Sequence, residues 1–452
     1  MAGEKSKPVL FVGAVDKICA QAIEFFAVAT NAHLLLVDDA DEDTIRQATL
    51  KVPAGRASYR KVDIYKPSEL HAAVACAGLV VNGRQPYHRS SRAVIRACIE
   101  AKVAYLDYSD DVKSTQDSLS LAELAKNAGI PCYINCGAAP GMSNIMAVDA
   151  AKGMDSIDAI DVCWYLTDQG GANGKEVLEH LMDITAGPCL TWADGRATIH
   201  ENWVETAHTP IGPNGADVIL HESVHPEPIT LARAFPKTTR IRCLGAINPA
   251  PFNGFAQGLG KAVATGTMSM DVACDFLWDL STQSKSKSQE GTRSAGLGAF
   301  ISHLRGGDIS LNELVQLLGH VAGSLDPWRH AFGGMLDDVR KGYCSYVDVI
   351  KFLTYSAVGR KFPYEAGMLV RVIGTRNGTP VEVIKRRPAS GAGASMAADI
   401  GASSATFITM IWENELGRRT GVYCPEDWVD PQTFYKCMER LGFHSEQIVE
   451  TA

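Results

Sequence analysis

A loop near the end of the first quarter of the sequence holds side chains that can bind a substrate and move protons. The loop Asn82–His88 follows an apolar run and places Tyr87 and His88 next to each other. A histidine titrates near neutral pH and can exchange a proton there, and Arg84 can bind a carboxylate through two hydrogen bonds. These residue types suit proton transfer to or from a bound substrate that has a carboxylate. The alternatives are that His88 begins a surface helix and that Arg84 is an ordinary surface side chain.

A second set of candidate residues is spread over the next 130 positions. Asp107 follows another apolar run, so its carboxylate could bind a substrate ammonium group or instead cap the next helix. Arg233 is a candidate for binding a substrate carboxylate, and Asn144 is a candidate neutral donor. His225 and Glu227 could line the same pocket, or they could belong to a rigid turn bounded by prolines.

Metal binding and nucleophilic catalysis are not expected from the residue spacing. His221 and His225 are four residues apart, but Pro226 follows directly and denies them a shared helix face. No third ligand stands at a recognised zinc spacing, so we predict no metal site. Cys136 has no base at a defined spacing, which favours a buried structural thiol.

Strands and helices alternate through the first 135 residues. Helical patterns at Lys17–Ala29, Arg92–Lys102 and Asp117–Ala128 separate short apolar runs. This alternation is typical of βαβ units in a doubly wound parallel sheet, the Rossmann architecture of the α/β class. The six predicted strands are Val9–Val12, His33–Val37, Val62–Ile64, Leu79–Asn82, Val103–Leu106 and Ile130–Asn135.

The alternation stops after Ala150, and an α+β region follows. Ile157–Leu166 is predicted to be a longer strand, and Asn377-Gly378 predicts a hairpin because both residues tolerate a positive φ. Ser281–Ser294 has the composition of a surface loop. The remaining predictions are hairpin strands at Leu369–Gly374 and Pro380–Lys385 and helices at Leu311–Gly323, Ser345–Val358 and within Ala394–Gly442.

A chain of 452 residues exceeds what one hydrophobic core usually supports, so we expect two domains. We predict a dinucleotide-binding domain at residues 1–139 and an α+β substrate and dimerisation domain at residues 140–393. Residues 394–452 are predicted to return as helices to the first domain.

The turn after the first strand is the predicted cofactor site. Gly13 stands at the first glycine position of the dinucleotide-binding pattern, but Val15 and Ile18 occupy the other two. A Cβ at the second position hinders the close approach of a pyrophosphate. A domain of this fold that no longer binds a dinucleotide is therefore the alternative.

Other residues favour a retained dinucleotide site. Asp38 ends the second strand, where a carboxylate accepts hydrogen bonds from ribose hydroxyls and repels a 2′-phosphate, or it could be an exposed turn residue. Asp63 is expected near the adenine. We predict NAD as the cofactor, with NADP possible. The full predicted cofactor set is Gly13, Ala14, Val15, Asp38, Asp63, Gly83, Gln85 and Pro86.

Four segments in order along the chain resemble the saccharopine dehydrogenase family. The resemblance implies a Rossmann domain completed by C-terminal helices, an α+β substrate domain and often a dimer. It also implies an NAD(P)-dependent oxidoreductase that acts on the C–N bond of an amino acid or its imine. The segments are Leu79–Asp111, Asn135–Asn144, His225–Leu231 and Gly421–Pro431.

Two departures from the family leave other functions open. The glycine pattern is eroded, and Ala139 stands before Pro140 where saccharopine reductases have an aspartate, so saccharopine is not the expected substrate. A non-redox lyase or cyclising deaminase with tightly held NAD is one alternative. A non-catalytic regulatory protein is another.

Charge and hydropathy narrow the class of partner. The net charge of −8 disfavours nucleic acid, which needs clustered basic surface. There is no uninterrupted apolar run of about 18 residues that could span a membrane, and Met1–Pro8 is polar, so we expect a cytoplasmic protein. The expected partners are a small-molecule amino acid or imine and a second copy of the chain.

Overall fold

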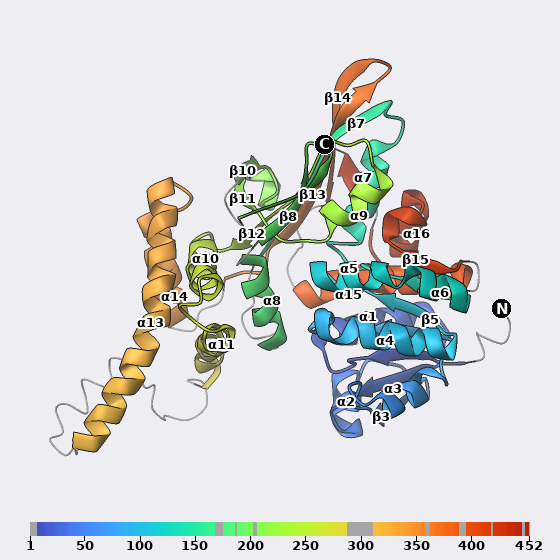
Figure 1. Ribbon diagram of the computed structural model, residues 1–452, viewed down its shortest axis with the longest axis horizontal. Coiled ribbons are helices and arrows are strands. Elements are labelled where there is room, and N and C mark those ends of the chain that lie inside the picture. The colour runs from blue at the N-terminus through green and yellow to red at the C-terminus, as the bar shows by residue number, and fades with distance from the viewer. Residues whose placement is uncertain are drawn as a thin grey trace. The chain divides into compact units, whose positions relative to one another are not determined.

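The computed structural model describes residues 7–167, 175–185, 188–201, 206–286, 311–357, 362–387, 395–416, 419–444 and 448–451. The chain forms two compact units (Figure 1). The first consists of residues 1–166, 188–245 and 364–452 and contains nearly all of both β-sheets. The second consists of residues 167–187 and 246–363 and is mainly helical where it is described. The boundaries predicted at residues 139 and 393 stay a prediction, because one compact unit can contain more than one domain.

The first sheet has seven parallel strands in the order β15-β6-β5-β4-β1-β2-β3. The order reverses beside β1, which is the position where ligands bind in doubly wound folds. This confirms the predicted α/β class and Rossmann architecture. The strands are β1 (Val9–Val12), β2 (Leu34–Asp38), β3 (Ala57–Lys61), β4 (Leu79–Asn82), β5 (Ala104–Asp107), β6 (Pro131–Tyr133) and β15 (Gly421–Tyr423).

Alternate residues of the central strand face opposite helical layers. Leu10 and Val12 belong to a core with residues of α3 and α4, whereas the Phe11 ring lies 5.8 Å from the Phe26 ring of α1. Burial on both faces explains why β1 is apolar at every position. The helices between the strands are α1 (Lys17–Ala29), α2 (Glu42–Ala48), α3 (Pro67–Val74), α4 (Tyr87–Ala101), α5 (Val112–Ser120) and α6 (Ala122–Ala128).

A second, mixed sheet follows α7 (Met142–Ala151). Its main path is β10-β11-β12-β7-β13-β14-β16, and the β8–β9 hairpin is attached through β12. The predicted hairpin is confirmed, with φ of 52° at Asn377 and 72° at Gly378. The strands are β7 (Ser156–Thr167), β8 (Pro188–Ala193), β9 (Arg196–Glu201), β10 (Thr206–Thr209), β11 (Val218–Glu222), β12 (Arg240–Asn248), β13 (Ala366–Arg376), β14 (Thr379–Arg387) and β16 (Glu450–Thr451).

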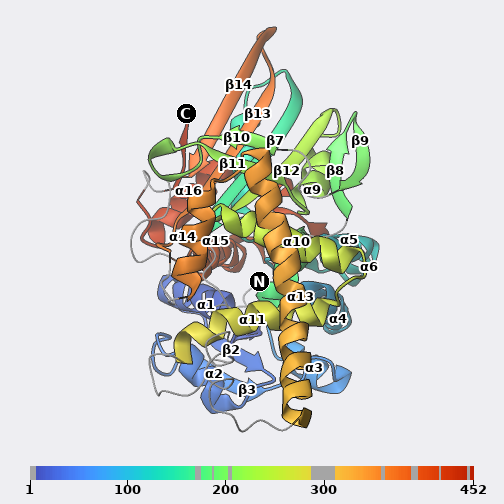
Figure 2. The ribbon, with the colours of Figure 1, turned by 90° about the vertical axis from the view of Figure 1, so that its left-hand side faces the viewer.

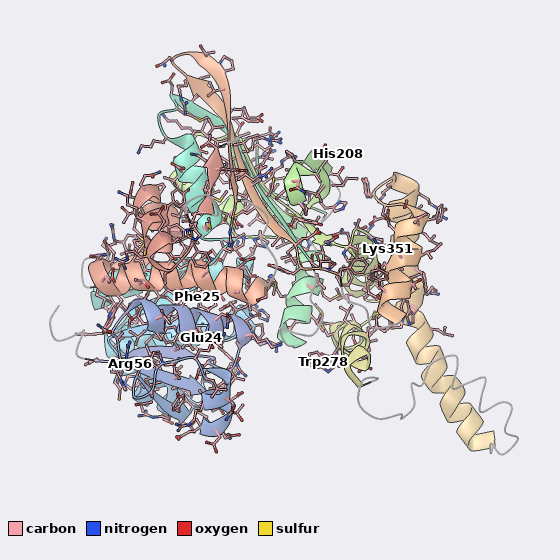
Figure 3. All side chains as sticks on the ribbon, turned by 180° about the vertical axis from the view of Figure 1, so that it is seen from behind. Glu24, Phe25, Arg56, His208, Trp278 and Lys351 are labelled. Carbon is pink, nitrogen blue, oxygen red and sulfur yellow. The ribbon has the colours of Figure 1, made fainter. Side chains whose placement is uncertain are left out.

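The C-terminal segment contributes to the first unit. Helix α15 (Met396–Met410) packs along α1, near the labelled Phe25 in Figure 3. Strand β15 then pairs with β6 and completes the parallel sheet. The 3₁₀ turn η4 (Pro425–Asp427) and α16 (Pro431–Arg440) follow, and both contact α7.

The second unit is a group of helices, shown side by side in Figure 2. Helices α10 and α13 pack closely because Gly254 and Gly258 of α10 approach the α13 backbone, where a Cβ would overlap it. None of the described helices is both long and apolar enough to cross a membrane. The helices are α8 (Lys175–Thr185), α10 (Pro251–Ala264), α11 (Met270–Ser286), α13 (Leu311–Lys341) and α14 (Tyr346–Ala357), and α9 (Glu227–Ala234) belongs to the first unit.

Several predicted elements were wrong. The third strand is Ala57–Lys61 and not Val62–Ile64, because an edge strand needs little apolar sequence while Val62 and Ile64 are buried just beyond its end. Asp117–Ala128 is split into two helices at Leu121. The prediction for Ala394–Gly442 named only helices and their linkers and missed the strand β15. Of the predicted loop, residues 281–286 are helical, and residues 287–294 lie outside the described residues.

Candidate active site

The β1–α1 turn lies tightly against the loop that follows β4. Gly13 has a φ of 83°, and a Cβ there would lie 2.7 Å from the Arg84 Cα. A Cβ at Gly83 would overlap the Tyr108 hydroxyl and the Cys19 thiol. Both glycines are therefore required by contacts within the protein itself.

The backbone N–H groups of this turn already have acceptors. Gly13 and Ala14 both donate to the Val37 carbonyl, and Val15 donates to Asp38 Oδ2 at 3.1 Å. At the start of α1, the Asp16 carboxylate accepts from the backbone N–H groups of Ile18 and Cys19, at 2.8 and 3.1 Å. A pyrophosphate binds in this fold through such N–H groups and is repelled by a carboxylate.

The predicted ribose-binding residue is buried beside an arginine. Asp38 is 4% exposed, and burial raises its pKa. The neighbouring Asp39 has a lowered pKa because of its hydrogen bond with Asp38. Arg84 donates to Asp38 Oδ1 at 3.2 Å and to Asp39 Oδ2 at 2.8 Å. Arg84 would have to leave both carboxylates to bind a substrate, so that role stays a prediction.

An open surface cavity of about 700 Å³ lies beside Asp39, at the end of the sheet formed by β2 and β3. Asp63, the residue predicted near the adenine, lines it. Its carboxylate accepts from the Tyr65 backbone N–H at 3.0 Å. The cavity is also lined by Lys61, Tyr65, Lys66 and Glu69.

These residues suit one part of a dinucleotide and not another. Asp38 and the cavity beside Asp39 suit the adenosine half of NAD or NADP. The turn does not suit the pyrophosphate in this arrangement, because its described N–H groups are taken and Asp16 places a negative charge there. Gln85 and Pro86, which are joined by a cis peptide, are partly exposed at the same edge, and their cofactor role stays a prediction.

Tyr87 and His88 begin α4 at the carboxyl end of β4. Tyr87 is 4% exposed, and its hydroxyl has no hydrogen-bond partner among the described residues. Burial raises the Tyr87 pKa well above its usual range. His88 Nδ1 lies 3.2 Å from Asp111 Oδ2, and Asp111 also caps α5. The imidazole is thus held by a carboxylate, an arrangement that suits proton transfer.

Asp107 is fully buried and accepts three hydrogen bonds. The donors are the Tyr105 hydroxyl at 2.8 Å and the backbone N–H groups of Asn135 and Ser109 at 2.9 and 3.2 Å. Burial raises the Asp107 pKa to about 6. The α5 cap is Asp111, so Asp107 is not the helix cap, and its predicted role towards a substrate amine stays untested.

Asn144 lies at the centre of a second polar group that joins α7, α9 and η4. Its Nδ2 donates to Glu426 Oε2 at 2.9 Å and to Thr230 Oγ1 at 3.0 Å. The other carboxylate oxygen, Glu426 Oε1, is buried and has no hydrogen-bond partner among the described residues. Burial raises the Glu426 pKa to about 7, so its carboxyl group can hold or release a proton near neutral pH.

His225 and Arg233 lie on the segment that contributes Thr230. His225 Nδ1 is 3.0 Å from Glu227 Oε2, and the Ser143 hydroxyl donates to Glu227 Oε1 at 3.0 Å. Arg233 is 42% exposed at its side chain and lies 3.8 Å from Asp427 Oδ2. An exposed guanidinium near Glu426 can donate hydrogen bonds to a ligand carboxylate.

The segment Asn135–Cys136 connects the two polar groups. The backbone N–H groups of both residues donate to Asp107, and Cys424 Sγ lies 4.0 Å from Asn135 Oδ1. Burial raises the pKa of the Cys136 thiol, with further contributions from the charges of Asp107 and Glu426. Cys136 is fully buried, which supports the structural role predicted for it.

Sequence reasoning missed Glu426 as a site residue, and it named Glu227 only as a residue that could line the pocket together with His225. Glu426 is 282 positions from Asn144, so no local spacing could relate them. Its only sequence signal was its place in a segment that resembles the family. Glu227 follows a proline at the start of a helix, where an acidic residue is usually explained by the helix dipole.

Comparison with known proteins finds a family match for the parallel-sheet domain. Residues 9–132 match the family model of the saccharopine dehydrogenase NADP-binding domain. These residues are therefore similar to the NADP-binding domain of saccharopine dehydrogenases. The match also supports the predicted cofactor class, NAD or NADP.

One protein similar in sequence and one solved structure similar in fold extend this likeness. Carboxynorspermidine synthase from Vibrio cholerae is 34% identical over 109 residues, which are 22% of this chain and 25% of that protein. The matched segment therefore spans about a quarter of the length of that protein. Apo saccharopine dehydrogenase (L-Glu forming) from Saccharomyces cerevisiae superposes with a TM-score of 0.60 at 13% identity, over 99% of this chain and 100% of that chain. This structural match shows the saccharopine dehydrogenase fold across both sheets and the helical unit.

Proposed function

We propose that the protein is an NAD(P)-dependent oxidoreductase acting on the C–N bond of an amino acid or its imine. The match of residues 9–132 to the saccharopine dehydrogenase NADP-binding domain supports the dehydrogenase part. The observation that supports amine chemistry most directly is the Glu426 carboxyl group, with its pKa of about 7 and a buried Oε1 that has no partner among the described residues.

Formation of an amine from an imine requires a proton at the nitrogen, and the chain offers two groups for it. Glu426 can donate this proton because its carboxyl group is partly protonated at neutral pH. His88, held by Asp111, is the second candidate. Arg233 binds the substrate carboxylate in this proposal, since its side chain is exposed and close to η4.

Tyr87 and Asp107 have different tasks in this proposal. The Tyr87 hydroxyl, which has no hydrogen-bond partner among the described residues, donates a hydrogen bond to the ligand, because a ligand acceptor stabilises such a buried polar group. Asp107 orients the Asn135–Cys136 segment, because its carboxylate accepts from the Asn135 N–H and its backbone carbonyl accepts from the Cys136 N–H, and it acts as a positioning residue. Asn144 fixes the Glu426 carboxylate, and Glu227 does the same for His225.

A second candidate function is a regulatory protein that binds an amino acid without redox chemistry. The β1–α1 turn favours it, because Asp16 and Asp38 occupy N–H groups that would otherwise bind a pyrophosphate. The substrate-side residues would then form a binding site alone.

A cofactor titration followed by a substrate screen decides between these functions. NADH and NADPH are titrated separately while nicotinamide fluorescence is recorded, and mixtures of 2-oxo acids and amines are then tested for loss of reduced cofactor. The oxidoreductase proposal expects saturable binding and a secondary amine product identified by mass spectrometry. Folded protein that binds neither nucleotide but does bind an amino acid establishes the regulatory function instead.

The proposal also includes a homodimer in the cytoplasm that does not bind nucleic acid. The net charge of −8 supports the last point, because a negative surface repels a phosphate backbone. Light scattering measures the mass in solution, and a gel-shift assay at low salt tests nucleic acid binding.

A further inference from the structure

Three side chains from three strands meet at the edge of the second sheet. Cys189 lies on β8, His200 on β9 and Glu222 at the end of β11. One ligand atom from each, the thiol sulfur, an imidazole nitrogen and a carboxylate oxygen, lie within 4.8 Å of one another. We propose that this cluster binds one Zn²⁺ ion, at a site that has no part in the proposed oxidoreductase chemistry.

The backbone of the sheet sets this geometry. Cys189 and His200 are directly opposite each other in the β8–β9 hairpin, so their side chains extend from the same face. Asp194 and Gly195 close this hairpin with φ of 52° and 71°, the values of a tight two-residue turn. Strands β8 and β11 both pair with β12, which brings Glu222 to the hairpin.

The chemistry of the donor set selects zinc. A tetrahedral Zn²⁺ holds sulfur, nitrogen and oxygen ligands roughly 3.3–3.6 Å apart, and His200 Nε2 already lies 3.3 Å from Glu222 Oε1. Thiolate and imidazole ligands together favour Zn²⁺ over Mg²⁺ or Ca²⁺, which bind through oxygen. One thiolate and one carboxylate also balance the two positive charges of the ion. Such balance is needed where Cys189 and Glu222 are each only 1% exposed.

Access from solvent distinguishes this cluster from a similar one nearby. His225, Glu227 and Cys243 also place their ligand atoms within 4.8 Å of one another. In that cluster both Glu227 oxygens take hydrogen bonds, from His225 and Ser143, and all three side chains are buried. The His200 side chain is 31% exposed, so an ion can enter and a water molecule can complete its coordination.

Cobalt substitution and zinc titration of the full-length protein test the proposal. After removal of metal with a chelator, Co²⁺ is added and the absorption spectrum is recorded, and Zn²⁺ affinity is then measured against a chromophoric chelator. We expect one ion per chain and a thiolate-to-cobalt charge-transfer band. Cys189→Ser should abolish the band, and His200→Gln should weaken Zn²⁺ binding by at least about 100-fold, since even indirect changes around a zinc ligand cost 10–100-fold.

The matched control is Cys243→Ala, which removes the thiol of the neighbouring cluster and should leave the band and the affinity unchanged. Absence of a charge-transfer band in the unaltered protein overturns the proposal, as does a band that persists in Cys189→Ser. Circular dichroism checks the folding of each variant. If Cys189→Ser does not fold, the Zn²⁺ affinity of His200→Gln decides, because His200 lies at the exposed edge.

Discussion

The β1–α1 turn and the polar group around Asn144 differ in how their hydrogen bonds are satisfied. In the turn, Asp16 and Asp38 accept from backbone N–H groups that a dinucleotide would use in other proteins of this fold. Around Asn144, the donors also find acceptors, but Glu426 Oε1 is left buried without a partner among the described residues. In the turn, side chains of the protein itself occupy the N–H groups. Around Asn144, one carboxylate oxygen can still accept a hydrogen bond.

This difference indicates where ligand binding is still built into the fold. Protein interiors satisfy nearly all buried polar atoms, so an unsatisfied carboxyl oxygen is commonly found where a ligand binds. A turn whose backbone N–H groups already have acceptors within the protein gains stability and loses affinity for a ligand. The comparison therefore predicts strong effects from changes around Glu426 and small, opposite effects from changes at Asp16.

The largest expected effect is on turnover. Glu426→Gln keeps the size and the Asn144 hydrogen bond of the side chain but removes the acidic proton. If Glu426 transfers the amine proton, kcat should fall by about 10²–10⁴-fold. Steady-state rates with the substrate identified by the screen provide the measurement. Glu413→Gln, which alters a surface ion pair with Arg440, is the control, and equal losses in both variants would contradict the role.

The pH dependence of stability should follow the same carboxyl group. The Glu426 pKa is about 7 in the folded protein against 4.5 for an ordinary glutamate, so the folded state binds the proton more tightly. Its contribution to stability is therefore complete below about pH 4.5 and is lost as the pH rises through about 7. This loss amounts to about 2–3 kcal/mol in the free energy of unfolding, and Glu426→Gln should not show it. Urea unfolding between about pH 5 and pH 8 measures it, and parallel curves for both proteins would refute the buried-carboxyl explanation.

Substrate affinity should depend on Arg233. Arg233→Ala removes a charge-assisted hydrogen bond to the substrate carboxylate, which costs about 1.5–3 kcal/mol, so KM should rise by roughly 10–100-fold with a smaller change in kcat. Arg329→Ala, at an exposed helix position, is the matched control. An unchanged KM for Arg233→Ala would exclude it as the carboxylate-binding residue.

The smallest expected effect is a gain of cofactor affinity at the closed turn. Asp16→Asn keeps a helix-capping side chain but removes the negative charge at the start of α1. Binding of NADH or NADPH should become tighter by up to about tenfold, the scale of one charge at a helix terminus. Asp430→Asn makes the same exchange at the start of α16 and should have no effect on nucleotide affinity. Weaker binding after Asp16→Asn would show that the carboxylate contacts the cofactor favourably.

Sequence patterns predicted the elements that are strongly periodic or apolar. The α1 helix, the β1 strand and the Asn377-Gly378 hairpin were predicted correctly, because burial on known faces or a turn with positive φ restricts the residues allowed. Strand β3 was missed because it is an edge strand of polar residues. Strand β15 was missed because only three residues pair with β6, too few to show a period.

The sequence by itself determined the fold class and carried a resemblance to the saccharopine dehydrogenase family, and it identified Asn144, His88 and Arg233 as candidates through residue type and nearby motifs. Only the tertiary structure related Asn144 to Glu426, and Glu222 to the hairpin residues Cys189 and His200, since these contacts join segments that are distant along the chain. The structure also decided that Arg84 binds Asp38 and Asp39 and that Asp16 closes the turn. Local patterns report which faces are buried, whereas the partner of a buried polar atom depends on how whole strands and helices come together.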